Sequence, residues 1–368
     1  MRRVFSSLVI MSLLATIIST TSCSIAGRKS VEKNIKFNSD FDEMLYLASL
    51  AGSSHNTQPW RVERLSDNLV KVYPDFSRHL KVVDPSSRGL YISLGAFVQT
   101  FVLAGNSKGI QCNVVLDSLT NQSNPHIVIQ LNQGVQSSEN WVKRIKERRT
   151  LRSSFSRAKI KEGDLSYLFA GENRQNIVCF DASSKIGSYI SDNMLKAYIS
   201  QNQDTAALSE LAEWMRFSNK DVLSKRDGLT TSGMELKGFA GNMVRLFFKP
   251  EDSKKSSFVN KGVEKTAKQV VDCGGWIIIG NNQNNPIGWV EAGMAYTRIN
   301  LKCRDLMIGF HPMNQIIEVE AYEKEFDKLM VTSSQENDSS SFKVHFIARI
   351  GYVSEYPDPV SVRRTIKM

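Results

Sequence analysis

The sequence predicts a protein that combines helices and strands in two similar halves. Three observations carry this prediction. Apolar residues recur at helical spacing over residues 41–51, short stretches of strand type follow, and the helix-then-strand pattern of the first half returns in the second. With 368 residues, 41% of them apolar and 23% charged, the composition is that of an ordinary globular protein with a large core.

The elements of the first half follow in a clear order. The helix over residues 41–51 ends at Ala51-Gly52, and the polar loop 53–60 then leads into a predicted hairpin. Asp84-Pro85 begins a new segment, and a longer helix that carries small residues follows over 92–109. The predicted strands are 61–63, 69–73, 112–116 and 125–131.

The second half repeats this order. The segment Trp289–Tyr296 parallels Tyr91–Val98, because each has a glycine and an alanine early in a helix, followed by an apolar stripe. An apolar strand, 275–280, precedes the second copy. We therefore expect a diverged internal repeat, although a helix followed by a strand is also a common unit. Two stretches, 215–261 and 333–341, have the composition of mobile segments.

The N-terminus has the pattern of an export signal. Two arginines precede an apolar stretch over residues 8–18, which is too short to span a bilayer of roughly 30 Å. Thr21-Ser22-Cys23 resembles the end of a lipobox, with Thr20 where leucine is usual, and Arg2-Arg3 also fits a twin-arginine signal. We expect a signal over 1–23, a tether over 24–40, and a location in the cell envelope or periplasm. Lipidation of Cys23 stays open.

The charge of the chain favours small anions over nucleic acid. The formal charge is +10, from 47 basic and 37 acidic residues, and basic residues gather at 2–3, 143–152 and 363–367. Because no long basic arm with interleaved aromatics is present, nucleic-acid binding is not expected. Small basic clusters suit a phosphate group.

Missing signatures exclude several kinds of enzyme site. The sequence lacks GxGxxG, GxxxxGK, HExxH and GxSxG, and its five histidines and five cysteines show no metal-ligand spacing. A metal site and a Ser-His-Asp hydrolase are therefore not expected. Cys112, Cys179, Cys273 and Cys303 are expected to be buried free thiols, with disulfide pairing left open.

Two polar segments can do chemistry together. Arg148-Arg149-Thr150-Leu151-Arg152 offers planar guanidinium groups, which bind phosphate through paired hydrogen bonds, although a solvated charge run is the alternative. The loop Ser53–Trp60 supplies Ser, Asn and Gln side chains. Their donors and acceptors match the pyrimidine edge of an isoalloxazine ring. A helix cap followed by a turn is the alternative for this loop.

The same two segments carry a resemblance to a known family. Gly52–Trp60 resembles the APSxxNxQPW segment of nitroreductases, and Arg148–Phe155 resembles their RRSxRxF segment. The order of the segments is reversed here, as in the fused, single-chain branch that includes the mycobacterial Acg-type proteins. Asp227-Gly228 and Arg363-Arg364 match two further segments of the family less closely. The resemblance covers residues 41–368.

The resemblance implies an α+β fold, with a mixed central sheet flanked by helices, and an internal pseudo-dimer. Its first lobe would be 41–142 and its second 143–368. FMN would be held noncovalently between the lobes. Only one FMN is expected per chain, because neither motif occurs twice. The residues that would bind the FMN phosphate, the ring edge and the region near N5 are Arg148, Arg149, Thr150, Arg152, Arg363, Arg364, Ser54, His55, Asn56, Gln58, Asp227 and Gly228.

Three functions follow as alternatives. In the first, the protein is an FMN-dependent oxidoreductase that passes hydride to a nitroaromatic, a quinone or a similar acceptor, with NAD(P)H or an unknown donor. No side chain would be catalytic, because the chemistry is centred on the flavin. In the second, the protein sequesters FMN, with residues 215–261 as a lid. In the third, it is an exported binding protein without cofactor. A monomer or weak homodimer is expected in each case.

Overall fold

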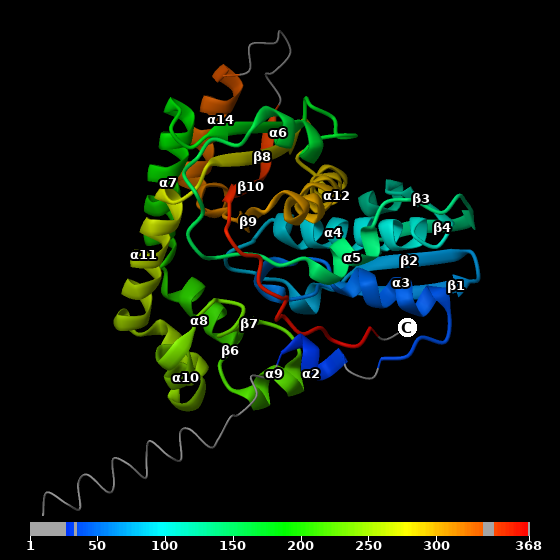
Figure 1. Ribbon diagram of the computed structural model, residues 1–368, viewed down its shortest axis with the longest axis horizontal. Coiled ribbons are helices and arrows are strands. Elements are labelled where there is room, and N and C mark those ends of the chain that lie inside the picture. Colours follow the sequence, from blue (N-terminus) through cyan, green and yellow to red (C-terminus); the bar gives the residue numbers. More distant parts are fainter. Residues whose placement is uncertain (1–26, 33–34, 334–341, 367–368) are drawn as a thin grey trace, which may run out of the picture.

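The protein is built of two halves that pack along a pair of long central helices (Figure 1). The structure, a computed structural model, describes residues 27–32, 35–333 and 342–366. The predicted signal, with Cys23, lies outside the described residues, as does most of the predicted mobile stretch 333–341.

The first half contains helices, short 3-10 helices and four strands. They are α2 (Arg28–Glu32), α3 (Asp40–Ser49), η1 (Ser54–Asn56), β1 (Trp60–Ser66), β2 (Leu69–Pro74), η2 (Phe76–Arg78), α4 (Arg88–Asn106), β3 (Ile110–Val115), η3 (Asp117–Thr120) and β4 (Ile127–Gln133). Ser39 caps α3, because its hydroxyl accepts a 3.1 Å hydrogen bond from the amide of Asp42. The predicted helices and strands of this half are confirmed within a few residues.

The second half contains more helices. Its elements are α5 (Trp141–Glu147), α6 (Glu162–Leu168), β5 (Ile177–Asp181), α7 (Lys185–Gln201), α8 (Thr205–Glu213), β6 (Met215–Arg216), α9 (Asn219–Lys225), β7 (Leu229–Thr230), α10 (Gly238–Phe247), η4 (Pro250–Lys254), α11 (Ser256–Val271), β8 (Gly275–Asn281), α12 (Pro286–Cys303), η5 (Arg304–Leu306), β9 (Ile308–Pro312), α13 (Gln315–Glu318), α14 (Glu320–Ser333) and β10 (Lys343–Tyr352).

The strands confirm the α+β class but correct the expectation of one mixed sheet. Within the described residues, each half has its own four-stranded antiparallel sheet, with orders β1-β2-β4-β3 and β5-β8-β10-β9. A small parallel pair, β6 and β7, is separate. The sheets stay apart because α4 packs on the first sheet, α12 packs on the second, and the two helices pack on each other.

The two sheets have the same topology. In each, the second strand leads into the long helix, and the helix is followed by two antiparallel strands: α4 by β3 and β4, and α12 by β9 and β10. The sheet orders coincide when β1, β2, β3 and β4 are matched to β5, β8, β9 and β10. The repeated order of elements in the sequence is therefore a repeated arrangement in space.

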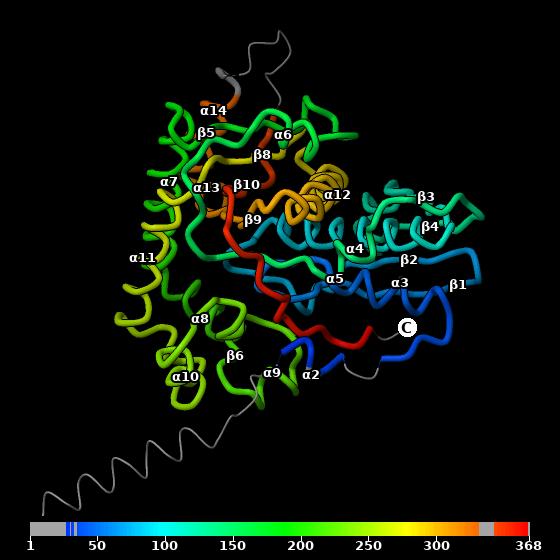
Figure 2. Tube along the Cα trace, in the orientation of Figure 1, coloured from blue at the N-terminus to red at the C-terminus, as the bar shows by residue number. Residues whose placement is uncertain are grey.

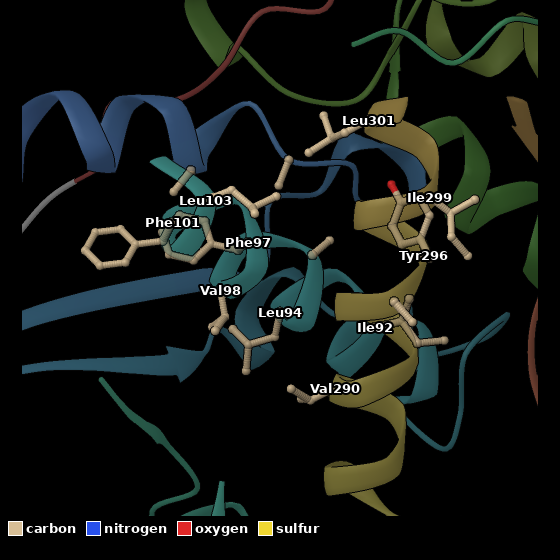
Figure 3. Close-up of a cluster of buried hydrophobic side chains, with 14 of the residues drawn as sticks. Ile92, Leu94, Phe97, Val98, Phe101, Leu103, Val290, Tyr296, Ile299 and Leu301 are labelled. Carbon is tan, nitrogen blue, oxygen red and sulfur yellow. The ribbon is translucent and has the colours of Figure 1, made fainter. Parts of the chain in front are cut away.

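Two glycines allow α4 and α12 to pack closely. A Cβ atom at Gly95 would lie 2.1 Å from the carbonyl oxygen of Val290, and one at Gly293 would lie 2.1 Å from that of Ile92. Gly95 thus faces Val290, three residues before Gly293, and Gly293 faces Ile92, three residues before Gly95. Such reciprocal contacts are those of two helices related by a twofold axis. Figure 3 shows the apolar side chains of both helices in one cluster. By composition α4 could cross a membrane, but here it is mostly buried.

Two segments differ from the sequence-based expectation. Residues 28–32, expected as part of a tether, form α2, and Arg28 is buried with its guanidinium donating to the carbonyl of Lys146. Residues 215–261 form short strands and helices that lie below the second sheet in Figure 1, and η4 among them packs against α8. Their apolar residues lack one clean period because the stretch is divided among several short elements. The last segment, after β10, runs back across the molecule to the first half (Figure 2).

Candidate functional site

The loop between α3 and β1 has an unusual backbone. His55, Asn56 and Gln58 all have positive φ angles, of 46°, 54° and 54°. Such angles cost of order 1 kcal/mol or more for residues other than glycine, so surrounding contacts must hold them. The hydroxyl of Ser53 accepts from the amide of Gln58 at 3.0 Å, and the amide of Ser54 donates to the hydroxyl of Ser93 at 3.2 Å.

The amides of Asn56 and Gln58 join this loop to two distant segments. The Nε2 of Gln58 donates to the carbonyl of Arg226 at 2.8 Å, and its Oε1 accepts from the amide of Arg364 at 2.9 Å. The Nδ2 of Asn56 lies 3.4 Å from the carbonyls of Gly228 and Val362. These side chains, expected at a ring edge, are thus hydrogen-bonded within the protein. A buried amide must find partners, and the backbone of the neighbouring segments supplies them.

Asp227 is held between two arginines. Its carboxylate accepts from Arg216 at 2.8 Å and forms a second ion pair with Arg78, and all three side chains are largely buried. Gly228 follows with a φ of 73°, and its amide donates to the carbonyl of Asn56 at 3.3 Å. The Asp227-Gly228 segment therefore lies against the loop. The Asp227 carboxylate serves the fold, because it neutralises two buried cations.

Arg148 and Arg363 meet at the C-terminal end of α3. Two nitrogens of Arg148 donate to the carbonyl of Leu50 at 3.1 and 3.2 Å. Arg363 donates to the carbonyls of Ser49, Leu50 and Ala51. Cations stabilise this end of a helix. The remaining Nη1 of Arg148 is buried without a hydrogen-bond partner.

Arg149 and Arg152 lie against the segment that follows β7. Arg149 pairs with Glu235 at 3.4 Å and donates to the carbonyl of Asp358 at 2.5 Å. Arg152 donates through Nη1 to the carbonyl of Gly233 at 2.9 Å, while its amide donates to the Glu235 carboxylate at 3.1 Å. Thr150 is half-buried between them. The arginines of the Arg148–Arg152 motif are thus held by contacts within the protein and do not form a solvated charge run.

The arginine cluster, formed by Arg148, Arg149, Arg152 and Arg363, carries more positive charge than the neighbouring carboxylate of Glu235 neutralises. Burial, with Arg148 and Arg28 nearby, lowers the pKa of Arg363 to about 9. Burial also lowers the pKa of Arg152, an effect that Glu235 opposes and that Arg149 and Arg148 strengthen. Among the described residues, neither Arg148 nor Arg363 forms an ion pair with a carboxylate. An anion brought to this cluster would find charge and at least one free donor.

His55 lies beside the cluster as a neutral ring. Burial and the positive charge of Arg152 lower the pKa of His55 to about 4, and its Nδ1 atom is buried without a partner. The neighbouring Gly52 is needed where it stands, because a Cβ there would lie 2.0 Å from the hydroxyl of Tyr296 and 3.6 Å from Nη1 of Arg148. The loop, α12 and the arginine cluster therefore meet at one place.

The structure brings together most of the residues selected from the sequence, and it adds others. The loop, the arginine motif, the Asp227-Gly228 segment and Arg363-Arg364 converge, although up to 314 positions separate bonded partners. Arg78, Glu235 and Tyr296 were not selected from the sequence. Only the place of Tyr296 within the repeated segment Trp289–Tyr296 could have drawn attention to it. Two hollows of about 330 and 410 Å³ lie elsewhere and are not lined by these residues.

Comparisons with known proteins give structural likeness only. No family model matches the chain, and no curated protein matches it. A nitroreductase with bound FMN from Desulfitobacterium hafniense is 15% identical, with a TM-score of 0.33, over 59% of this chain and 91% of that one. An FMN-dependent nitroreductase from Mycobacterium smegmatis in complex with NADPH is 12% identical, with a TM-score of 0.32, over 58% and 91%.

A putative nitroreductase from Anabaena variabilis is 11% identical, with a TM-score of 0.34, and the match covers 86% of this chain and 90% of that one. Identities and TM-scores this low do not by themselves establish a shared family.

Proposed function

We propose that the protein binds FMN and is an oxidoreductase of nitroreductase type, with hydride passing through the flavin to a nitroaromatic, quinone or similar acceptor. One observation carries the proposal: four segments far apart in the sequence converge on a buried arginine cluster that has an unpartnered donor, Nη1 of Arg148. A phosphate dianion would supply the missing partner and the missing negative charge.

The residues fit the phosphate of FMN better than they fit its ring edge. Arg148, Arg152 and Arg363 would hold the phosphate, because their guanidinium groups are buried and short of anionic partners. At the ring, His55 offers a buried, neutral nitrogen, whereas the amides of Asn56 and Gln58 would keep the loop in place. When bound, FMN supplies two-electron redox chemistry. The protein supplies binding, orientation and the exclusion of water.

A specific contact favours the second function, sequestration of FMN with little turnover. The segment after β7 covers the arginine motif, with Glu235 on Arg149 and the Gly233 carbonyl on Arg152. A segment that stays in this position would restrict the approach of a nicotinamide. The two functions share one binding site and differ in whether a reductant reaches it.

A visible spectrum before and after anaerobic addition of NADPH or NADH tests both functions. We expect the purified protein to be yellow with flavin and to bleach on addition of the nicotinamide. A yellow protein that bleaches with dithionite but not with NADPH or NADH would support sequestration. A colourless protein that takes up no FMN on titration would reject flavin binding altogether.

We also propose that the protein is exported to the cell envelope and anchored through Cys23. The support is the pattern of residues 1–23 alone. Intact-mass analysis after expression in a bacterial host should give a lipidated product that begins at Cys23. A soluble product that begins downstream of Cys23 would contradict lipidation and leave export standing.

A further inference from the structure

Helix α10 presents an apolar face to solvent. Phe239, Leu246 and Phe247 are 73%, 65% and 67% exposed, and Met243 is 38% exposed. These four residues stand at positions i, i+7, i+8 and i+4, which places them on one side of the helix. We call them the α10 face. Single exposed apolar residues are ordinary on protein surfaces, whereas four on one side of one helix mark a binding surface.

Lysines frame the α10 face. Lys237 and Lys249 lie at the two ends of the helix, both are exposed, and neither forms an ion pair within the described residues. Residues 236–261 contain six basic and two acidic side chains. Both acids already pair with lysines, Glu251 with Lys254 and Asp252 with Lys255. The surface around the α10 face is therefore positive, which suits an anionic partner.

Helix α2, the first described helix, lies toward the same edge of the molecule in Figure 1. Helices α2, α9 and α10 lie along the lower edge of the molecule in the view of Figures 1 and 2. Val31 of α2 packs against Val222 of α9. On α9, Leu223 is 45% exposed, with Lys220 and Lys225 exposed near it. A second apolar side chain with basic neighbours thus extends the pattern of α10.

We propose that the α10 face lies on the surface of a bilayer that contains anionic lipid, with α10 in the interfacial plane. Ten residues of helix span about 15 Å, about half the thickness of the hydrocarbon core, so the helix cannot cross it. A second copy of this chain fits less well, because a symmetric contact would bring the lysines of both copies together. Anionic headgroups would neutralise those lysines while the acyl region takes up the apolar side chains. The proposal goes beyond flavin chemistry and does not depend on it.

A site-specific fluorophore tests this placement. Phe247→Cys carries the environment-sensitive dye NBD on the α10 face. Val135→Cys is the matched control, because Val135 is 93% exposed and comes two residues after β4, a strand that lies far from α10 in Figure 1. Both variants also carry Cys23→Ser. Burial raises the pKa of Cys112 and Cys179 to about 12 and of Cys273 to about 11, and Cys303 is fully buried, so these thiols label poorly.

The labelled full chains are titrated with vesicles of phosphatidylcholine and phosphatidylglycerol. We expect the dye at 247 to shift to the blue and to be quenched by doxyl-labelled lipid, and the dye at 135 to do neither. Because both proteins share one N-terminus, anchoring by the leader cannot produce this difference. Adding Lys237→Gln and Lys249→Gln should weaken partitioning about thirtyfold, from the usual contribution of two lysines near an anionic surface.

Two results would overturn the proposal. Equal responses at 247 and 135 would mean that the α10 face does not meet lipid. A blue shift at 247 that rises with protein concentration in the absence of vesicles would assign the face to a second copy of the chain. Circular dichroism of both variants checks that the fold is intact, so a loss of signal cannot be ascribed to unfolding.

Discussion

At the scale of single residues, the site depends on buried groups that the fold does not fully satisfy. Arg148 gives two of its donors to the carbonyl of Leu50 and leaves Nη1 buried and unpaired. An unpartnered buried donor costs about 1–3 kcal/mol, and more when it is charged. A protein that keeps such a group in its core keeps it at some cost to stability, and a bound anion would remove that cost.

We predict that Arg148→Gln weakens FMN binding about ten- to a hundredfold. Loss of one charge-assisted hydrogen bond removes roughly 1.5–3 kcal/mol, which corresponds to that range of Kd. Titration of FMN into the apo-protein measures the effect. Arg157→Gln is the control, since Arg157 is in the same segment but is exposed and pairs with Asp272. Equal affinities of the two variants would remove Arg148 from the site.

At the scale of elements, one helix pair organises the molecule. Helices α4 and α12 pack through reciprocal glycine contacts, and each also covers the sheet of its own half. The loop before β1 and the arginine motif both reach this pair, through Gly52 beside the Tyr296 hydroxyl. A shift between the two helices would therefore move the two sides of the site relative to each other.

We predict that Gly95→Ala and Gly293→Ala each destabilise the protein by about 1–3 kcal/mol, the usual cost of overpacking a core. The costs should be similar, because each added Cβ meets a backbone carbonyl at the same 2.1 Å. Gly163→Ala in α6 is the control. Its Cβ would meet nothing within 4 Å, so a gain of about 0.5–1 kcal/mol is expected from helix propensity. Urea unfolding measures all three, and a neutral Gly95→Ala would contradict the close packing.

At the scale of the whole molecule, buried neutral histidines connect stability to pH. Burial, with Arg88 and Lys343 adding to it, lowers the pKa of His345 to about 3. Burial and the charges of Arg349, Arg152 and Lys265 lower the pKa of His311 well below its usual range. Unfolding releases both rings to water, where they take up protons near pH 6.5.

We predict that the free energy of unfolding falls as the pH drops from 6.5 toward 4. The folded pKa of each histidine is the lower one, so the unfolded chain binds more protons in this window and stability is full only above it. Each histidine contributes about 1.4 kcal/mol per pH unit. Urea unfolding of the wild type and of His345→Gln at pH 7, 6, 5 and 4.5 should show a slope shallower by about one proton in the variant. Parallel slopes would count against this assignment.

We also predict one FMN per chain. The parts of the site come from both halves, since the loop of the first half bonds to Arg226 and Arg364 of the second. Neither half alone could form it, and the motifs occur once. Flavin released by heat and measured against protein should approach one per chain. A value near two would reveal a second, degenerate site and would contradict the interpretation that the fused chain forms a single site.

The sequence alone determined the local structure and the pieces of the site. Apolar periodicity and a closing glycine predict α3 and α4. The parallel between Tyr91–Val98 and Trp289–Tyr296 predicts a repeated order of helix and strand, and the two sheets share one strand order. The loop 53–60 and the Arg148–Arg152 motif stand out because their residue types suit one kind of ligand. Such patterns are readable from sequence because they depend on neighbours a few positions apart.

Only the tertiary structure decided how these pieces are used. In the folded chain the side-chain amides of Asn56 and Gln58 donate to the backbone of distant segments, and Asp227 forms ion pairs with Arg78 and Arg216. It also places the strands in two sheets. These outcomes depend on which groups must be satisfied once they are buried together, and partners hundreds of residues apart leave no local pattern in the sequence.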